Sequence, residues 1–180
     1  MKVRLIIFAF LLSSIKLFSQ NAVPNGYQNI KLGMDLEETK EELVKNPDFG
    51  YHGDRDVSLL PGGNKQVLIE TDAEFSTSTN FLTRCWFQFY ENKLYIITIN
   101  LNKEKIDYYS MFTTLTDKYG LPTKLDPKKA IWENDEYTMI LEKPVSIKYI
   151  EKATYNQLLT SANVEKSGFE ITKQMFMDEF

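Results

Sequence analysis

Two neighbouring segments with alternating side chains, TRCWFQFY and KLYIITINL, constrain the fold more than any other feature of the chain. Successive side chains of a β-strand point to opposite faces of a sheet, so this alternation is typical of strands with one buried face. Glu91-Asn92 separates the two segments, which predicts a β-hairpin. We expect one face of the hairpin to contribute the following side chains to the core: Cys85, Phe87, Phe89, Tyr95, Ile97, Ile99 and Leu101.

The opposite face of the hairpin holds the candidate binding residues. By the same alternation they are Arg84, Trp86, Gln88, Tyr90, Leu94 and Ile96. Arginine, tryptophan and tyrosine are enriched at binding hot spots, because they combine a large apolar area with a directed polar group. We therefore predict an exposed sheet surface centred on Trp86. The alternative is that the C-terminal segment covers this face and turns it into a second, minor core.

A capped helix precedes the hairpin. Asp35 fits the N-cap position and Glu38 lies three residues later, which predicts a capping box. The helix is expected to end near Asn46, because Pro47 disfavours helical geometry in the residue before it. Its apolar face is predicted to carry Leu36, Leu43 and Val44, with Thr39 and Lys40 in the middle.

A second helix is predicted after the hairpin. Asn102 fits its N-terminal cap, and Gly120 followed by Pro122 fits its end. Apolar residues recur along it at spacings of three and four and form a stripe wide enough to cover a sheet. The stripe consists of Tyr108, Met111, Phe112, Leu115 and Tyr119.

The remaining segments complete the predicted domain. Two or three short strands are predicted in AIWENDEYTMILEKPVSIKYI, with turns at Asn134-Asp135 and near Lys143-Pro144. An earlier turn between extended segments is predicted at LLPGGNK. The chain thus contains two units of a helix followed by strands, at about 30–101 and 102–151. We predict an α+β domain over 21–151, with a largely antiparallel sheet and both helices on one face.

A helical tail is predicted over residues 152–180. ATYNQLLTSANV and FEITKQMFMDEF each fit a short helix, and Ser167-Gly168 separates them. Phe169, Thr172 and Phe176 lie near one face of the second helix, so it is a candidate for partner binding. The alternative is a frayed terminus or one that docks on the domain itself.

The N-terminus has the parts of a secretory signal. A basic start is followed by the apolar run Leu5–Leu12 and then by a more polar segment, so residues 1–20 are predicted to be a signal peptide. The run is too short to span a bilayer, and Lys16 interrupts its continuation, so we expect no membrane span in the mature chain. Because no cysteine follows the signal directly, no lipid anchor is expected. The protein is predicted to be exported, to the periplasm or the medium.

Charge and cysteine content narrow the possible partners. Removing residues 1–20 takes away three basic residues and no acid, which changes the formal net charge from −4 to −7. This acidity disfavours nucleic acid and anionic lipid, since both need a basic patch. Cys85 is the only cysteine, so no intramolecular disulfide can form. We interpret it as a small core residue, with a reactive thiol as the alternative.

The sequence contains few elements of catalytic machinery. His52 is the only histidine, and Asp54 and Asp56 follow it closely; a solvated loop is the simplest interpretation. No glycine-rich phosphate loop, G-x-S-x-G elbow or C-x-x-C pair occurs. We therefore predict no catalytic residue, no metal and no cofactor. A pair of carboxylates brought together from distant strands remains the alternative.

Two short motifs carry a resemblance. The stretch Gly33–Glu38 resembles the glycine-methionine turn and capped helix that begin the repeat of β-lactamase inhibitory proteins and of small outer-membrane-assembly lipoproteins. The stretch Lys118–Pro122 is similar to the exit of those helices. The first helix lacks this exit, and the second lacks the glycine-methionine entry. The resemblance implies a non-enzymatic exported module that binds another protein on its open sheet face.

Taken together, these features predict an exported binding module for a protein or an envelope component. Recognition would use the sheet surface around Arg84, Trp86 and Tyr90. The alternative is a small-ligand carrier or a hydrolase with a pocket between the sheet and the tail. In that case His52 or scattered carboxylates would supply its polar groups.

Overall fold

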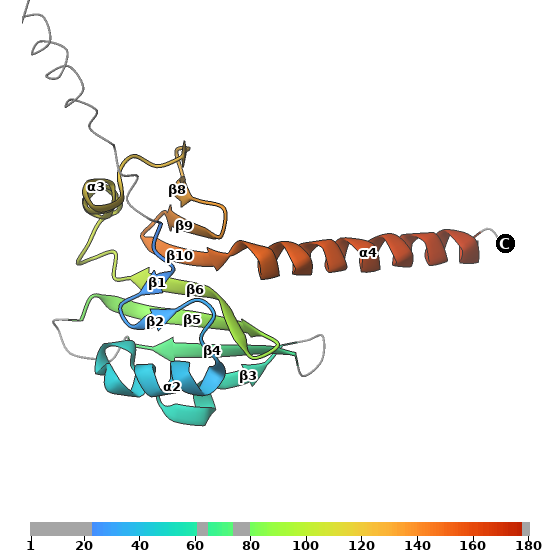
Figure 1. Ribbon diagram of the computed structural model, residues 1–180, viewed down its shortest axis with the longest axis horizontal. Helices are drawn as coiled ribbons and strands as arrows, with labels where there is room; N and C mark the ends of the chain where they lie inside the picture. Colours follow the sequence, from blue (N-terminus) through green and yellow to red (C-terminus); the bar gives the residue numbers. More distant parts are fainter. Residues whose placement is uncertain (1–22, 61–64, 74–79, 178–180) are drawn as a thin grey trace, which may run out of the picture.

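An eight-stranded antiparallel sheet forms the body of the molecule in the computed structural model, which describes residues 23–60, 65–73 and 80–177 (Figure 1). The strand order is β3-β4-β5-β6-β10-β9-β8-β7, so two four-stranded meanders meet where β6 pairs with β10. The strands are β3 (Val57–Leu59), β4 (Gln66–Asp72), β5 (Leu82–Tyr90), β6 (Lys93–Leu101), β7 (Lys124–Leu125), β8 (Lys129–Glu133), β9 (Tyr137–Glu142) and β10 (Ser146–Glu151). The predicted α+β class is confirmed. The predicted signal peptide and most of the LLPGGNK turn lie outside the described residues.

The first helix, α2 (Leu36–Lys45), has the predicted capping box. The Glu38 amide donates to the Asp35 carboxylate at 2.9 Å, and the Asp35 amide donates back to Glu38 at 3.0 Å. Asn46 caps the other end, as expected. The predicted apolar face was wrong at Val44, which is 71% exposed, because Thr39 and Leu43 face the sheet and the next position rotates away.

Two short 3-10 helices, η1 (Pro47–Phe49) and η2 (Gly53–Asp56), connect α2 to the sheet. A small hairpin of β1 (Gly26–Tyr27) and β2 (Ile30–Lys31) precedes α2. Phe49 is fully buried and packs edge-on against Phe87 at a ring distance of 5.7 Å. Ile30 also belongs to the main core. These short elements therefore fill space between α2 and the sheet.

The second helix, α3 (Tyr108–Tyr119), begins later than predicted. Its N-cap is Asp107, whose carboxylate accepts a hydrogen bond from the Ser110 amide at 2.9 Å. The predicted cap, Asn102, instead accepts from the Glu104 amide and closes a preceding turn. Gly120 ends the helix with a φ of 81°, as expected.

Both α2 and α3 pack on the same face of the sheet, as predicted, and we call this the inner face. One continuous core joins them. The strands contribute the completely buried side chains Ile69, Cys85, Phe87, Phe89, Leu94, Ile97, Ile99, Trp132, Met139 and Leu141. The predicted stripe of α3 packs against this core along its length.

The central hairpin of β5 and β6 turns at Glu91 and Asn92, whose φ angles of 48° and 62° suit a tight turn. Its register shifts next to the turn: Gln88 pairs with Ile96, but Phe89 pairs with Leu94. Tyr95 is the extra residue of this β-bulge. Between the bulge and the turn the alternation is inverted, so Leu94 faces the core and Tyr95 faces outward. Strict alternation had predicted the opposite face for each of these two residues, and both predictions were wrong.

The C-terminal segment forms one helix, α4 (Lys152–Met177), rather than the two predicted. It follows β10 directly, and the Glu151 carboxylate accepts hydrogen bonds from the Ala153 and Thr154 amides at 3.0 and 2.7 Å. The helix continues through Gly168, although an internal glycine costs about 1 kcal/mol. Figure 1 shows that most of α4 extends beyond the sheet. Among the described helices, none is both long and apolar enough to cross a membrane.

Candidate functional site

The outer face of the sheet, opposite α2 and α3, carries five of the six predicted binding residues. On β5 these are Arg84, Trp86, Gln88 and Tyr90, which alternate with the buried Cys85, Phe87 and Phe89; on β6 the fifth is Ile96. Leu94 is the exception. It is 1% exposed within the main core, because the bulge at Tyr95 turns it inward, so it cannot form part of a surface site.

The first turns of α4 cover part of this outer face. Leu158 packs on a second apolar cluster built from Tyr95, Ile96 and Ile150, together with the partly buried Tyr90. Ile96 is 7% exposed, so it lies beneath the helix rather than on a free surface. The alternative interpretation, a minor core under the C-terminal segment, therefore holds at this end of the face.

The rest of the outer face, around Trp86, is partly exposed. The register places Trp86 between Glu70 on β4 and the buried Thr98 on β6, both polar. The Trp86 side chain is mostly buried but keeps part of its surface exposed. Arg84 lies next to it with half of its side chain exposed. The Arg84 guanidinium is 3.2 Å from the Glu70 carboxylate and 3.5 Å from that of Asp72. The open region, which we call the Trp86 surface, consists of Arg84, Trp86 and Gln88.

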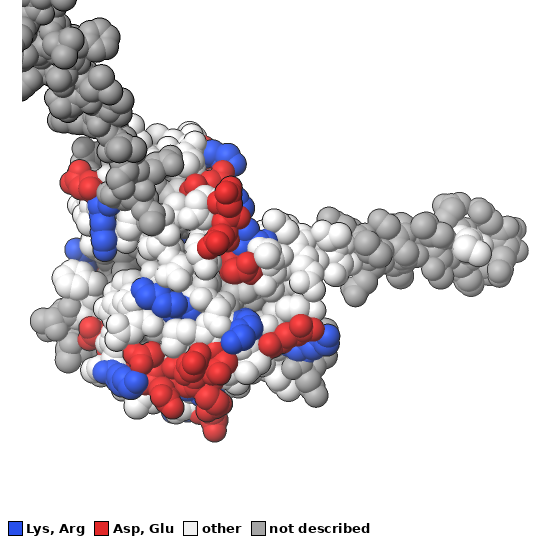
Figure 2. All heavy atoms as spheres, viewed as in Figure 1, with Lys and Arg blue, Asp and Glu red and all other residues white. Residues whose placement is uncertain are grey.

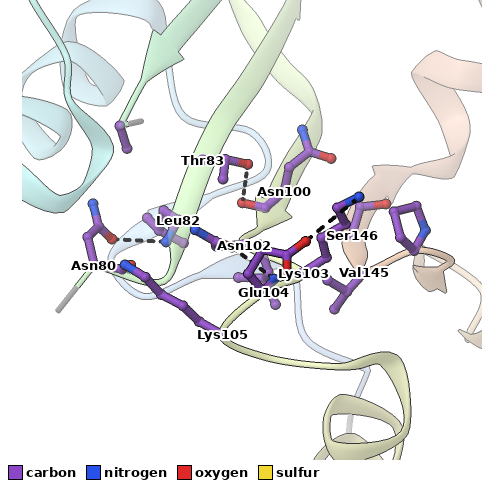
Figure 3. Close-up of a pocket in the computed structure, with 13 residues that line it drawn as sticks. Asn80, Leu82, Thr83, Asn100, Asn102, Lys103, Glu104, Lys105, Val145 and Ser146 are labelled. Atoms are coloured by element: carbon purple, nitrogen blue, oxygen red, sulfur yellow. Dashed lines mark hydrogen bonds and ion pairs between the residues drawn. The ribbon is translucent and has the colours of Figure 1, made fainter. Parts of the chain in front are cut away.

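Two cavities of about 450 Å³ each lie elsewhere on the molecule. The first lies at one end of β5, β6 and β10 (Figure 3). Its polar groups are engaged in holding the chain together: the Asn80 amide donates to the Asp48 carbonyl at 2.7 Å, and the Lys105 ammonium donates to the Asn80 carbonyl at 2.6 Å. No residue of α4 lines either cavity, so neither is the predicted pocket between sheet and tail.

The second cavity, which we call the aromatic cavity, joins three separate segments. Tyr108, Tyr109 and Phe112 come from α3, and Lys143 comes from the turn between β9 and β10. The third segment contributes Leu125, Asp126 and Pro127. The sequence reasoning missed this cavity because it assigned Tyr108 and Phe112 to the core stripe; Tyr109, an aromatic outside that stripe, was the available signal.

Cys85 behaves as a core residue. It is completely buried, and burial raises the pKa of its thiol to about 12. A thiol with so high a pKa is not a nucleophile near neutral pH. The interpretation of Cys85 as a small core residue is therefore confirmed.

The charged residues around α2 do not converge on a site. Figure 2 shows acidic side chains gathered over α2 on the helix-bearing side of the molecule. His52 lies 3.4 Å from Asp56, whereas Asp54 pairs with Lys40 at 3.1 Å. Within the described part of the chain, no group of three or more histidine, cysteine, aspartate or glutamate side chains is arranged to hold a metal ion.

Comparison with known protein families places most of this chain in one family. Residues 25–161 match the model of the TP0088 domain. The chain belongs to the TP0088 domain family. This TP0088 domain runs from just before β1 to the third turn of α4, so it includes both Leu158 and the Trp86 surface. No curated protein and no solved structure matches the chain, so the resemblance to β-lactamase inhibitory proteins gains no support.

Proposed function

We propose that this TP0088 domain is an exported binding module that holds another protein against its Trp86 surface. One observation carries the proposal: a tryptophan occupies a partly exposed position on the outer sheet face, between the polar residues Glu70 and Thr98. An indole that keeps part of its large apolar area exposed on a sheet face suits the centre of an interface.

Arg84 supplies the second part of the argument. Its exposed ion pairs with Glu70 and Asp72 contribute little to stability, since surface pairs are screened by water. They do hold the guanidinium near Glu70, which is the cross-strand partner of Trp86. The partner expected from this surface presents an apolar or aromatic side chain to Trp86 and polar groups to Arg84 and Gln88 around it.

The proposed location is outside the cytoplasm. The signal-like residues 1–20 support export, and the acidic mature chain supports a protein partner rather than nucleic acid. Cell fractionation and N-terminal sequencing of the native protein test this part. A mature N-terminus near Asn21 is expected, and a full-length cytoplasmic product would contradict it.

Binding is tested by cross-linking and pull-down from native envelope extract, with Trp86→Ala beside the unchanged chain. The matched control is Tyr109→Ala, which removes another exposed aromatic side chain from the opposite face of the molecule. We expect a partner that is captured by the unchanged chain and by Tyr109→Ala but lost with Trp86→Ala. Equal capture by all three proteins would refute the Trp86 surface as the binding site.

A further inference from the structure

We propose that the aromatic cavity binds a small amphipathic acid, with an apolar or aromatic body and one anionic group. This site lies on the helix-bearing side of the sheet and is separate from the Trp86 surface. Its volume of about 450 Å³ falls in the range typical of small-molecule sites, about 300–1,000 Å³.

The apolar part of the cavity is preformed. The rings of Tyr108 and Phe112 stack at 6.4 Å with an interplanar angle of 12°, and Phe112 packs on Trp132 at 6.3 Å. Trp132 is 2% exposed and its indole N–H donates to the Gly120 carbonyl at 2.8 Å, so it fixes the rings from beneath. A ligand would therefore meet a rigid aromatic floor, which lowers the entropy cost of binding.

The apolar surface also continues outside the cavity. Tyr109 and Leu125, which both line it, are 75% and 63% exposed. Pro127 lies in the same wall as Leu125. Exposed apolar side chains that gather at the mouth of a cavity are typical of ligand sites.

A cation marks one edge of the aromatic cavity. The Lys143 ammonium lies 5.2 Å from the centre of the Tyr108 ring, and within the described residues it forms no ion pair with a carboxylate. The backbone of Lys143 donates to the Lys128 carbonyl at 3.0 Å, which brings a second lysine close to this edge. An anionic group of a ligand would find an ammonium group here that is not held in an ion pair with a described acid.

Asp126 is the acid in the lining, and it is already engaged. Its carboxylate accepts hydrogen bonds from the Lys128 and Lys129 amides at 2.8 and 3.0 Å, and these bonds hold the pKa of the carboxyl below its usual range. The carboxylate is thus part of the turn that shapes the wall. The carboxylate stays ionised, but the charges of Lys128 and Lys129 also act on it. Together with Lys143, the cations at this edge outnumber the one acid of the lining, so the charges favour an anion over a cation.

The probe for this site is 8-anilinonaphthalene-1-sulfonate, an aromatic dye with one anionic group. Its neutral counterpart, N-phenyl-1-naphthylamine, serves as the comparison. Fluorescence titration of the mature chain is expected to show saturable binding of the anionic dye at one site. Lys143→Met should weaken that binding about fivefold, the factor that about 1 kcal/mol gives, and should leave binding of the neutral dye unchanged.

The chain offers a matched control for Lys143→Met. Lys118 also lies 5.2 Å above a tyrosine ring, that of Tyr119, but it does not line the cavity. Lys118→Met and Trp86→Ala should therefore bind both dyes as the unchanged chain does, which separates this site from the proposed protein-binding surface. Absence of saturable binding to the folded chain would overturn the proposal, as would equal weakening by the two lysine variants.

Discussion

The side chain of Trp132 links the end of α3 to the sheet, so its removal tests the packing that supports the aromatic cavity. Trp132→Phe keeps an aromatic ring against Phe112 but deletes the indole N–H, which donates to the Gly120 carbonyl at 2.8 Å. The lost hydrogen bond should cost about 1 kcal/mol. The smaller ring leaves unfilled space in the core and should cost about 1–2 kcal/mol more.

The expected total is therefore a loss of about 2–3 kcal/mol in the free energy of unfolding. Urea denaturation followed by far-UV circular dichroism measures it. Trp86→Phe is the control, because it makes the same chemical change at the only other tryptophan of the sequence, which is partly exposed on the outer face. That variant removes a partly exposed ring edge and should lose less, about 1 kcal/mol.

Equal losses for the two variants would refute the reasoning, because burial and the hydrogen bond to Gly120 would then contribute nothing measurable. A loss below about 1 kcal/mol for Trp132→Phe would refute it as well. The slope of unfolding free energy against urea should be the same for all three proteins, since none of the changes alters the surface exposed on unfolding by much.

Two further predictions follow from burial. Burial raises the pKa of the Cys85 thiol from 9.0 to about 12, so the unfolded chain loses this proton first and stability should fall as pH rises above about 9. Urea denaturation between pH 8 and 10 should show this decline, and a decline of equal size in Cys85→Ala would contradict it. Leu158→Asp should expose the first turns of α4 to amide hydrogen exchange, whereas Leu159→Asp, at a position 47% exposed, should not. Equal protection of the helix in both variants would show that Leu158 does not anchor it.

The elements predicted most accurately are those set by local chemistry. The capping box of α2 depends on Asp35 and Glu38 alone, and both hydrogen bonds form. The alternation predicted for β5 is also present, because buried residues alternate with more exposed ones from Arg84 to Tyr90. The start of α3 was less clear, since Asn102 and Asp107 are both good caps and only packing of the following stripe selects the second.

The register of β6 could not be predicted from its sequence. In KLYII four consecutive residues are apolar, so either Leu94 or Tyr95 satisfies an inward position. The bulge next to the hairpin turn selects Leu94 and leaves Tyr95 outside, where it packs with Ile96 beneath α4. Alternation specifies a face only where polar residues separate the apolar ones.

The two candidate sites also differ in how far the sequence predicts them. The Trp86 surface was predictable because its residues follow one another along a single strand. The aromatic cavity was not, because it brings together residues 108–112, 125–127 and 143, which are distant in the sequence and meet only when α3 packs on the sheet. The cover that α4 places over Ile96 also depends on tertiary packing, which no local pattern specifies.

The extent of the TP0088 domain tells which of these surfaces belong to the part of the chain that the family model covers, here called the shared unit. The match ends at residue 161, three positions after Leu158 and well before the end of α4. The shared unit therefore includes the turns that bury Ile96, and with them the boundary of the Trp86 surface. It also includes all three segments of the aromatic cavity. Because the two proposed sites lie on opposite faces of one sheet, the proposed protein partner and the proposed small ligand would not compete for the same surface.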